Sequence, residues 1–383
     1  MKILFVCQQY IHSARWINQL KDSHHEVYVF DCLDREIHPD LRWTTYKENW
    51  SQRKLPYIKG EDRLRKKKPV FYEKIESYLQ VTASEKLIEF IKEIQPDLIH
   101  SLEMQSETYP LLKVREKKSF RWAYSSWGSD IYHYQNNARH VKKIRNVLKQ
   151  VDYFFSDNSR DISLAKNHGF SGHFMPIFPG GGGYEFQHYK KYIQPVNERK
   201  TILIKGYHHW AGRALYVLEA LESILGELIK YEIYVYSAHQ IVIDKIKELN
   251  TKYSLNIQYS SRNEELSHED LLEQFGRATI AIGNSVTDGI PNTLLESIIC
   301  GAFPIQSNPG GVTEDHITDG VNGLLITNPE DITEIAEKIK KALNHKELIE
   351  KAFEINQEKA KQLDYKSIKS KVLDSYKKIE EEI

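Results

Sequence analysis

The chain has 383 residues, and its 53 basic and 53 acidic side chains give a formal net charge of zero. At roughly 100–200 residues per domain, this length predicts two or three domains. The balanced charge gives no signal for nucleic-acid binding, and the absence of any run of ~18 apolar residues argues against a membrane-spanning helix. Three widely spaced cysteines, Cys7, Cys32 and Cys300, fit neither a disulfide nor a metal-ligand pattern. We therefore expect a protein of the reducing cytoplasm.

The first segment reads as a βαβ unit. Lys2–Val6 and Glu26–Phe30 are strand-like, and Ala14–Lys21 between them is helical. The apolar start is too short for a signal peptide and has no small-residue cleavage site. The first loop lacks the Gly-x-Gly-x-x-Gly of dinucleotide-binding proteins, which argues against a dehydrogenase. His12 in this loop is a candidate substrate contact, and a surface or capping role suits it equally well.

A basic run follows at Arg53–Lys68, with eight basic and two acidic residues. Such a run is most often a solvated loop. It could instead face anionic lipid headgroups, which contribute ~1 kcal/mol per basic residue near the surface. Phe71 and Tyr72 beside the run favour the membrane interpretation.

The N-terminal sheet continues through Asp97–Ser101, Phe120–Ser126 and Tyr153–Ser156, and Gly172–Ile177 is its last predicted strand. The second of these strands leads into the loop Trp-Gly-Ser-Asp. Trp127 could stack on a sugar ring or pack in the core. Asp130 is the better polar candidate, although it could equally be the N-cap of the next segment.

Pro176–Pro195 carries three prolines and four consecutive glycines, which predicts a linker between two domains. Its backbone amides, including those of Gly181 and Gly182, could contact a substrate. The segment could also serve as a flexible hinge alone, and both roles are compatible.

A second sheet begins at Lys200–Lys205. The tail at Asp364–Ile383 is an amphipathic helix, because its apolar residues fall on one side. Further elements are predicted between these two segments: strands at Tyr231–Ser237, Leu255–Tyr259, Thr279–Gly283 and Phe303–Gln306, and helices at Leu215–Leu225, after Ser267, and from Asn328 to Leu343.

The most informative stretch is Ala281–Ile326, which reads as strand, loop, helix and strand. Pro291 opens the helix and Gly301 closes it. Asp288 lies just before the helix, and Glu296 lies eight residues later. The free N–H groups at the helix start form an anion site. A diphosphate bound there would place a ribose near Glu296 and a sugar near Asp288.

The order acid, seven residues, Glu, Cys-Gly, strand, Gly-Gly and Asp-Gly-x-x-Gly in this stretch resembles the nucleotide-sugar site of glycosyltransferase family 4. The resemblance implies the GT-B fold, an α/β fold of two Rossmann-like doubly wound domains facing an inter-domain cleft. We expect an acceptor-binding domain at residues 1–177 and a nucleotide-sugar-binding domain at residues 178–363. The helix at about 364–383 would pack back on the first domain. Two departures from the family are Asp288 in place of the usual Glu, and Trp127 where a histidine is common. A tryptophan cannot transfer a catalytic proton.

The resemblance further implies a retaining, metal-independent glycosyltransferase of the EC 2.4 class. It would use a nucleotide sugar as substrate, with UDP-sugar favoured, and need no cofactor. The acceptor would be a glycan, a lipid-linked or another glycoconjugate, for instance in polysaccharide biosynthesis. Such an enzyme would be cytoplasmic or peripheral at the inner face of the membrane.

Individual roles follow from the same resemblance. Glu296 would hold the donor ribose and Asp288 the sugar hydroxyls, while Lys205 and Arg213 would stabilise the departing diphosphate. The other implied donor contacts are Gly289, Ile290, Pro291, Asn292, Thr293, Leu294, Gly181, Gly182 and Tyr236, and the acceptor-side candidates are His12, Trp127 and Asp130.

Two rival functions remain open at this point. One is a sugar-nucleotide epimerase or hydrolase of the same fold, which would need acids and histidines for proton transfer. The other is a non-catalytic protein that binds a sugar nucleotide or glycan, and the departures at Trp127 and Asp288 keep it open.

Overall fold

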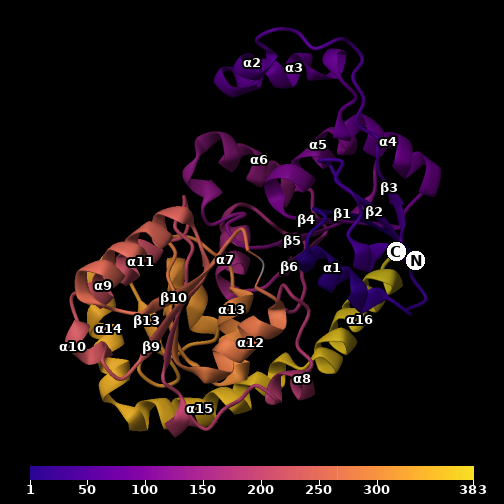
Figure 1. Ribbon diagram of the computed structural model, residues 1–383. Helices are drawn as coiled ribbons and strands as arrows, with labels where there is room; N and C mark the ends of the chain where they lie inside the picture. Colours follow the sequence, from indigo (N-terminus) through magenta and orange to yellow (C-terminus); the bar gives the residue numbers. More distant parts are fainter. Residues whose placement is uncertain (265) are drawn as a thin grey trace. The chain divides into compact units, whose positions relative to one another are not determined.

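A computed structural model describes residues 1–264 and 266–383. These residues form two compact units, each built around a parallel β-sheet with helices on both faces (Figure 1). The N-terminal unit comprises residues 1–157, 161–182 and 371–383, and the C-terminal unit comprises residues 158–160 and 183–370. The chain therefore passes into the second unit at Gly182–Gly183, five residues after the predicted boundary. The predicted α/β class is confirmed.

The N-terminal sheet has seven parallel strands in the order β3-β2-β1-β4-β5-β6-β7. Its central strands are buried on both faces, as parallel sheets covered by helices require. The strands are β1 (Lys2–Val6), β2 (Glu26–Phe30), β3 (Thr45–Lys47), β4 (Leu98–Leu102), β5 (Arg121–Ser126), β6 (Tyr153–Ser156) and β7 (His173–Phe174). The helices are α1 (Ile11–Ile17), α2 (Glu61–Lys67), α3 (Pro69–Leu79), α4 (Ala83–Ile94), α5 (Tyr109–Arg115), α6 (Ala138–Leu148) and α7 (Ser159–Asn167).

The C-terminal sheet has six parallel strands in the order β10-β9-β8-β11-β12-β13. The strands are β8 (Thr201–Lys205), β9 (Glu232–Ala238), β10 (Ile257–Ser261), β11 (Ala278–Gly283), β12 (Phe303–Ser307) and β13 (Leu324–Ile326). The helices are α8 (Phe186–Lys190), α9 (Ala214–Glu222), α10 (Leu225–Leu228), α11 (Gln240–Tyr253), α12 (His268–Arg277), α13 (Asn292–Cys300), α14 (Ile332–Asn344) and α15 (Lys346–Ala360), and α16 (Tyr365–Glu381) leads back to the N-terminal unit.

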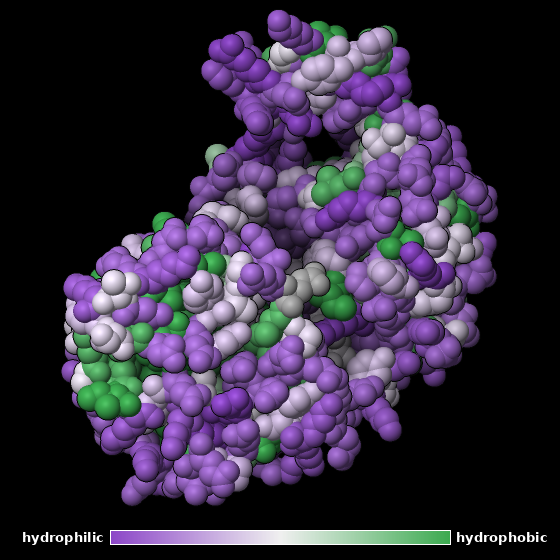
Figure 2. Space-filling model, in the orientation of Figure 1, coloured by the Kyte–Doolittle hydropathy of each residue, from purple (hydrophilic) through white to green (hydrophobic). Residues whose placement is uncertain are grey.

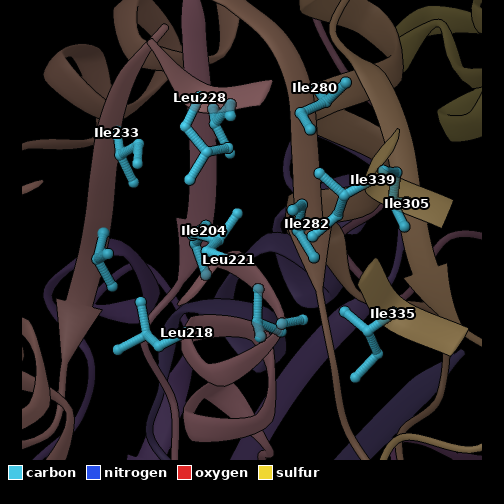
Figure 3. Packing of buried hydrophobic residues seen from close by; sticks show 14 of the residues in the cluster. Ile204, Leu218, Leu221, Leu228, Ile233, Ile280, Ile282, Ile305, Ile335 and Ile339 are labelled. Atoms are coloured by element: carbon cyan, nitrogen blue, oxygen red, sulfur yellow. The ribbon is translucent and has the colours of Figure 1, made fainter. Parts of the chain in front are cut away.

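Branched aliphatic residues fill the core of the C-terminal unit. Ile204, Ile280 and Ile282 project from neighbouring strands toward residues of α9 and α14, such as Leu218 and Ile335 (Figure 3). A second apolar layer, which includes α13, covers the other sheet face. The sheet is thus buried on both sides.

In each sheet the strand order reverses at one point. The reversal lies between β1 and β4 in the first sheet and between β8 and β11 in the second. Open α/β sheets bind ligands outside the carboxyl ends of their strands at such points. The loops after β8 and β11 are therefore the candidate ligand loops of the C-terminal unit.

Two sequence predictions need correction. The run Arg53–Lys68 is not simply a solvated loop, because residues from Glu61 onward form α2, which packs beside α3 (Figure 1). The buried Glu61 accepts hydrogen bonds from Arg53 at 2.6 and 2.9 Å and from Tyr72 at 2.9 Å. The predicted linker Pro176–Pro195 contains the short helix α8. Both helices depend on tertiary contacts, which apolar periodicity does not reveal.

Among the described residues, no helix combines the length and apolar character needed to cross a bilayer.

The C-terminal part of α16 is anchored in the N-terminal unit by a buried polar network. The Tyr376 hydroxyl lies 3.1 Å from the Trp16 indole nitrogen, which donates to it, and 2.8 Å from His100 Nδ1. The other ring nitrogen of His100 contacts the Ser125 hydroxyl at 2.9 Å. Burial lowers the pKa of His100 to about 3, so its imidazole is neutral. The Tyr376 hydroxyl is therefore the hydrogen-bond partner of two buried ring nitrogens, one in Trp16 of α1 and one in His100 of β4.

Tyr376→Phe should destabilise the N-terminal unit by about 1–3 kcal/mol, because it leaves the Trp16 and His100 nitrogens without a partner. Denaturant unfolding followed by tryptophan fluorescence would measure this, since five of the six tryptophans lie in this unit. Tyr78→Phe at a 72% exposed position is the matched control. Equal stability of the two variants would contradict the network's role.

Glu107, just after β4, should make stability depend on pH. Its carboxyl is fully buried, and one of its oxygens has no hydrogen-bond partner. Burial, and secondly the charge of Asp31, raise its pKa from 4.5 to about 8. The folded state therefore keeps a proton that the unfolded state has lost between about pH 4.5 and 8, so this group lowers stability as pH rises.

Glu107→Gln cannot ionise and should therefore melt higher than wild type at pH 9, by roughly 2–4 °C for each kcal/mol relieved. The difference should shrink toward pH 5. Thermal melts across this range, with the exposed Glu116→Gln as control, would show it. A pH-independent difference would indicate a packing effect instead.

Candidate active site

Asp288 lies in the loop between β11 and α13, at the reversal point of the C-terminal sheet. Burial raises the pKa of its carboxyl, and the positive charge of Lys205 at the end of β8 is the largest opposing influence. The Gly289 N–H donates to the same carboxyl at 3.0 Å. Two predicted donor-site residues, Lys205 and Asp288, therefore influence each other electrostatically.

Glu296 lies one turn inside α13, with only 3% of its surface exposed. Its Oε1 is 2.7 Å from Nε2 of His268, the first residue of α12. Burial and the nearby Glu296 charge raise the pKa values of Tyr236 and Cys300. The carboxylate thus lies between an imidazole and a buried phenol and thiol. Sequence reasoning missed His268, because nothing in the sequence distinguishes it from an ordinary first helical residue after a serine cap.

The start of α13 differs by one residue from the prediction, because Pro291 is its N-cap. The Pro291 carbonyl accepts hydrogen bonds from the N–H groups of Leu294 and Leu295 at 3.0 and 3.3 Å. The Asn292 side chain accepts one from the Tyr184 hydroxyl at 3.2 Å. The first backbone amides of a helix have no acceptor within the helix, and amides at this position are the groups that an anion binds.

Arg213 caps the start of α9, and its guanidinium already has partners. Its Nε donates to Glu330 at 2.5 Å, and its Nη1 donates to the carbonyls of His209 and Gly212 at 2.9 Å each. The backbone of Arg213 also pairs with Asn284, whose carbonyl accepts its N–H at 2.9 Å. Arg213 is therefore held beside the β11–α13 loop, and a bound anion would compete with Glu330.

A cationic cluster surrounds Tyr207, next to Lys205. The Lys205 ammonium and the Arg262 guanidinium lie 4.8 and 4.5 Å from the ring centroid, and His239 stacks on the ring at 5.5 Å. These residues come from the carboxyl ends of β8, β9 and β10, the edge at which Asp288 follows β11. The resemblance makes Ser261–Glu265 a candidate border of the nucleobase pocket; Arg262 lies within this segment, and Glu265 lies outside the described residues.

The acceptor-side candidates lie in the N-terminal unit, where Asp130 has mainly structural partners. Its buried carboxylate accepts hydrogen bonds from the N–H groups of Met104 and Trp127 at 3.0 and 3.2 Å and from the Tyr124 hydroxyl at 2.9 Å. The Trp127 ring is half-buried and packs edge-on against Trp16 at 6.3 Å. His12 lies in α1, with its ring 5.5 Å from that of Tyr10.

The glycines after β7 pack against α1. A Cβ at Gly182 would lie 2.8 Å from Nε2 of Gln19, and the backbone there has φ +74°, so glycine is required. Gly181 beside it is buried. The predicted site residues thus form two groups, one in each unit.

Two family descriptions match the chain. Residues 240–362 match the group 1 glycosyl transferases, and residues 2–158 match the glycosyl transferase 4-like family. Together the two matches cover more than half of the chain. No curated protein has a sequence similar enough to count as a relative.

Solved structures with the same fold are distant in sequence. Sucrose-phosphate synthase from Thermosynechococcus elongatus matches with a TM-score of 0.70 and 15% identity over the whole of both chains. Anabaena Alr3699/HepE, solved with UDP, matches with a TM-score of 0.72 and 14% identity, covering 99% of this chain and 100% of the other. The lipopolysaccharide outer core galactosyltransferase WaaB matches with a TM-score of 0.69 and 15% identity, covering 98% and 99%. The two family matches show that the chain belongs to the group 1, family 4-like glycosyltransferases. The solved structures show that it has the GT-B fold.

Proposed function

We propose that the chain transfers a sugar from a UDP-sugar to a hydroxyl of a glycan, lipid-linked or other glycoconjugate acceptor. Transfer would retain the anomeric configuration and would need no metal or other cofactor. The single observation that supports this best is the placement of Asp288 and Glu296 at either side of the first turn of α13, at the sheet's reversal point.

Each group of the donor would have a chemically suitable partner. The first-turn amides of α13 would bind the diphosphate, Glu296 would accept ribose hydroxyls, and Asp288 would accept hydroxyls of the transferred sugar. Lys205 and Arg213 would supply the positive charge that the departing diphosphate needs. Because Arg213 is paired with Glu330, the diphosphate would have to displace that carboxylate or use the remaining guanidinium donors.

The proposed reaction is balanced without a protein nucleophile. The bond between the anomeric carbon and the phosphate oxygen breaks, and its electron pair leaves with the nucleoside diphosphate. The acceptor oxygen bonds to the same face of that carbon, and its proton passes to the diphosphate. Catalysis would then rest on positioning and charge stabilisation.

Glu296→Ala should lower the affinity for the nucleotide about 10–100-fold, because hydrogen bonds to a charged group are lost. Thermal stabilisation by UDP-, GDP-, ADP- and CMP-sugars would measure it, since a hundredfold excess over Kd stabilises by ~2.7 kcal/mol. Glu350→Ala, an exposed position in α15, is the control. Stabilisation of Glu296→Ala equal to wild type would refute the assignment of the ribose carboxylate.

Turnover separates a transferase from the rival functions. The UDP-sugar should release UDP faster when a glycan or lipid-linked acceptor is added, and chelation of divalent metals should leave that rate unchanged. Equal turnover of the UDP-sugar without any acceptor would identify a hydrolase, if UDP is released, or an epimerase, if the sugar is altered while still bound to UDP. Binding with no turnover across an acceptor panel would identify a non-catalytic protein.

We also propose that Arg53–Lys68, with α3, contacts an anionic membrane surface. Residues 53–79 hold nine basic and four acidic side chains, while the chain as a whole is neutral. Residues 53–79, which include α2 and α3, are called the hairpin below. Apolar residues interrupt its hydrophilic surface (Figure 2). Six large apolar side chains within it are 47% or more exposed: Leu55, Tyr57, Ile58, Val70, Phe71 and Tyr78. Exposed apolar groups among cations suit the headgroup region of a bilayer.

A groove of about 630 Å³ lies beneath the hairpin in the same unit. Its lining runs from Arg65 and Glu76 of the hairpin to Leu33, Trp50 and Ser106. Leu33 and Ser106 follow the carboxyl ends of β2 and β4. This groove could guide a lipid-linked acceptor from a membrane toward that edge, which favours this acceptor class.

Lys66→Glu/Lys67→Glu/Lys68→Glu should weaken binding to anionic vesicles about 100-fold, at ~1 kcal/mol per basic residue. Co-sedimentation with phosphatidylglycerol and phosphatidylcholine vesicles would measure it. The control is the same reversal at exposed lysines of the C-terminal unit, Lys340, Lys346 and Lys351. Equal binding to both lipids, or equal loss in the control, would contradict the proposed surface.

A further inference from the structure

We propose that His268 is a positioning residue that fixes the Glu296 carboxylate for the ribose of the donor. The inference rests on the proposed function, because it assigns Glu296 to the ribose. It adds a second residue, from a different helix, to the recognition of the sugar part of the nucleotide.

A helix cap and two ring contacts fix the position of His268. Ser267 caps α12, with its hydroxyl accepting the Asp270 N–H at 3.1 Å, so the first helical residue is fixed. One side of the imidazole faces the Tyr189 ring edge-on at 6.3 Å. The Nε2 atom then reaches across to α13 and contacts Glu296 Oε1 at 2.7 Å. The ring is thus restrained on two sides.

Glu296 needs such a partner because it is otherwise held among weakly polar groups. Its side chain is 4% exposed, against 40% for His268. Tyr236 and Cys300, both buried, are close enough for its charge to raise their pKa values. A buried carboxylate without a hydrogen-bond donor is costly, and a long side chain without one can take several rotamers. A hydrogen bond from the His268 N–H satisfies the carboxylate and restricts its rotamers.

The contact with His268 leaves lone pairs of the Glu296 carboxylate available to accept hydrogen bonds from a ribose. A carboxylate offers about four lone-pair sites, and one imidazole N–H uses one of them. The remaining sites can accept the two neighbouring hydroxyls of a ribose from one direction. The hydrogen bond to Oε1 fixes the plane of the Glu296 carboxylate. Its remaining lone pairs are therefore oriented for the ribose before the nucleotide binds.

Removing either side of the contact tests the proposal. The affinities of UDP, GDP and ADP are measured calorimetrically on wild type, His268→Ala, His268→Gln and the neighbouring exposed Glu269→Gln. The tightest nucleotide is then compared with its 2′,3′-dideoxy analogue. His268→Ala should bind the ribonucleotide about tenfold more weakly, because an oriented hydrogen bond to a charged group is lost. It should bind the dideoxy analogue like wild type.

Two further readouts distinguish positioning from a general loss of structure. His268→Gln can still donate an N–H and should recover most of the affinity, and Glu269→Gln should match wild type. With a UDP-sugar, His268→Ala should raise KM and leave kcat nearly unchanged, because the ribose does not change during transfer.

The proposal is overturned if His268→Ala binds the ribonucleotide as well as or better than wild type, or loses both ligands equally. Those results, with nucleotide binding intact in wild type, would leave the proposed function standing. If wild type bound none of the three nucleotides, both the function and the role of His268 would be overturned.

Discussion

The burial of α13 beyond its first two residues is the constraint on which the candidate donor site depends. Every residue from Leu294 to Cys300 is buried, so the helix can neither rotate nor slide without exposing apolar surface. Its apolar side chains belong to the layer that covers one sheet face. The burial of its apolar neighbours therefore places Glu296 in the interior, where its carboxylate requires polar partners. The same packing fixes the helix start, where Asp288 and the first-turn amides lie.

Much of this arrangement could be predicted from local patterns. The runs of apolar residues locate the strands β1, β2 and β6, and Pro291 and Gly301 indicate the two ends of α13. These signals lie within one segment of chain, where side-chain periodicity and helix-capping preferences operate.

The partners of the site could not be found in the same way. His268 meets Glu296, and Glu330 meets Arg213, across separate segments that only the fold brings together. A sequence read alone shows which side chains can bind, but not which ones already have a partner. The Arg53–Lys68 run shows the same limit, because the sequence does not reveal that Glu61, at the start of α2, is buried and paired with Arg53.

The ligand loops after β8 and β11 are joined through their backbones. The N–H of Val286 donates to the carbonyl of Ala211 at 2.9 Å, and that of Arg213 donates to Asn284. Gly212 and Ser285 form a β-bridge between these contacts. Backbone hydrogen bonds depend on the shape of each loop and not on its side chains. The two loops can therefore be exchanged only as a pair. A chimera that takes these loops from a relative would have to exchange residues 206–213 and 284–290 together, because either segment alone would lose its backbone hydrogen-bond partners.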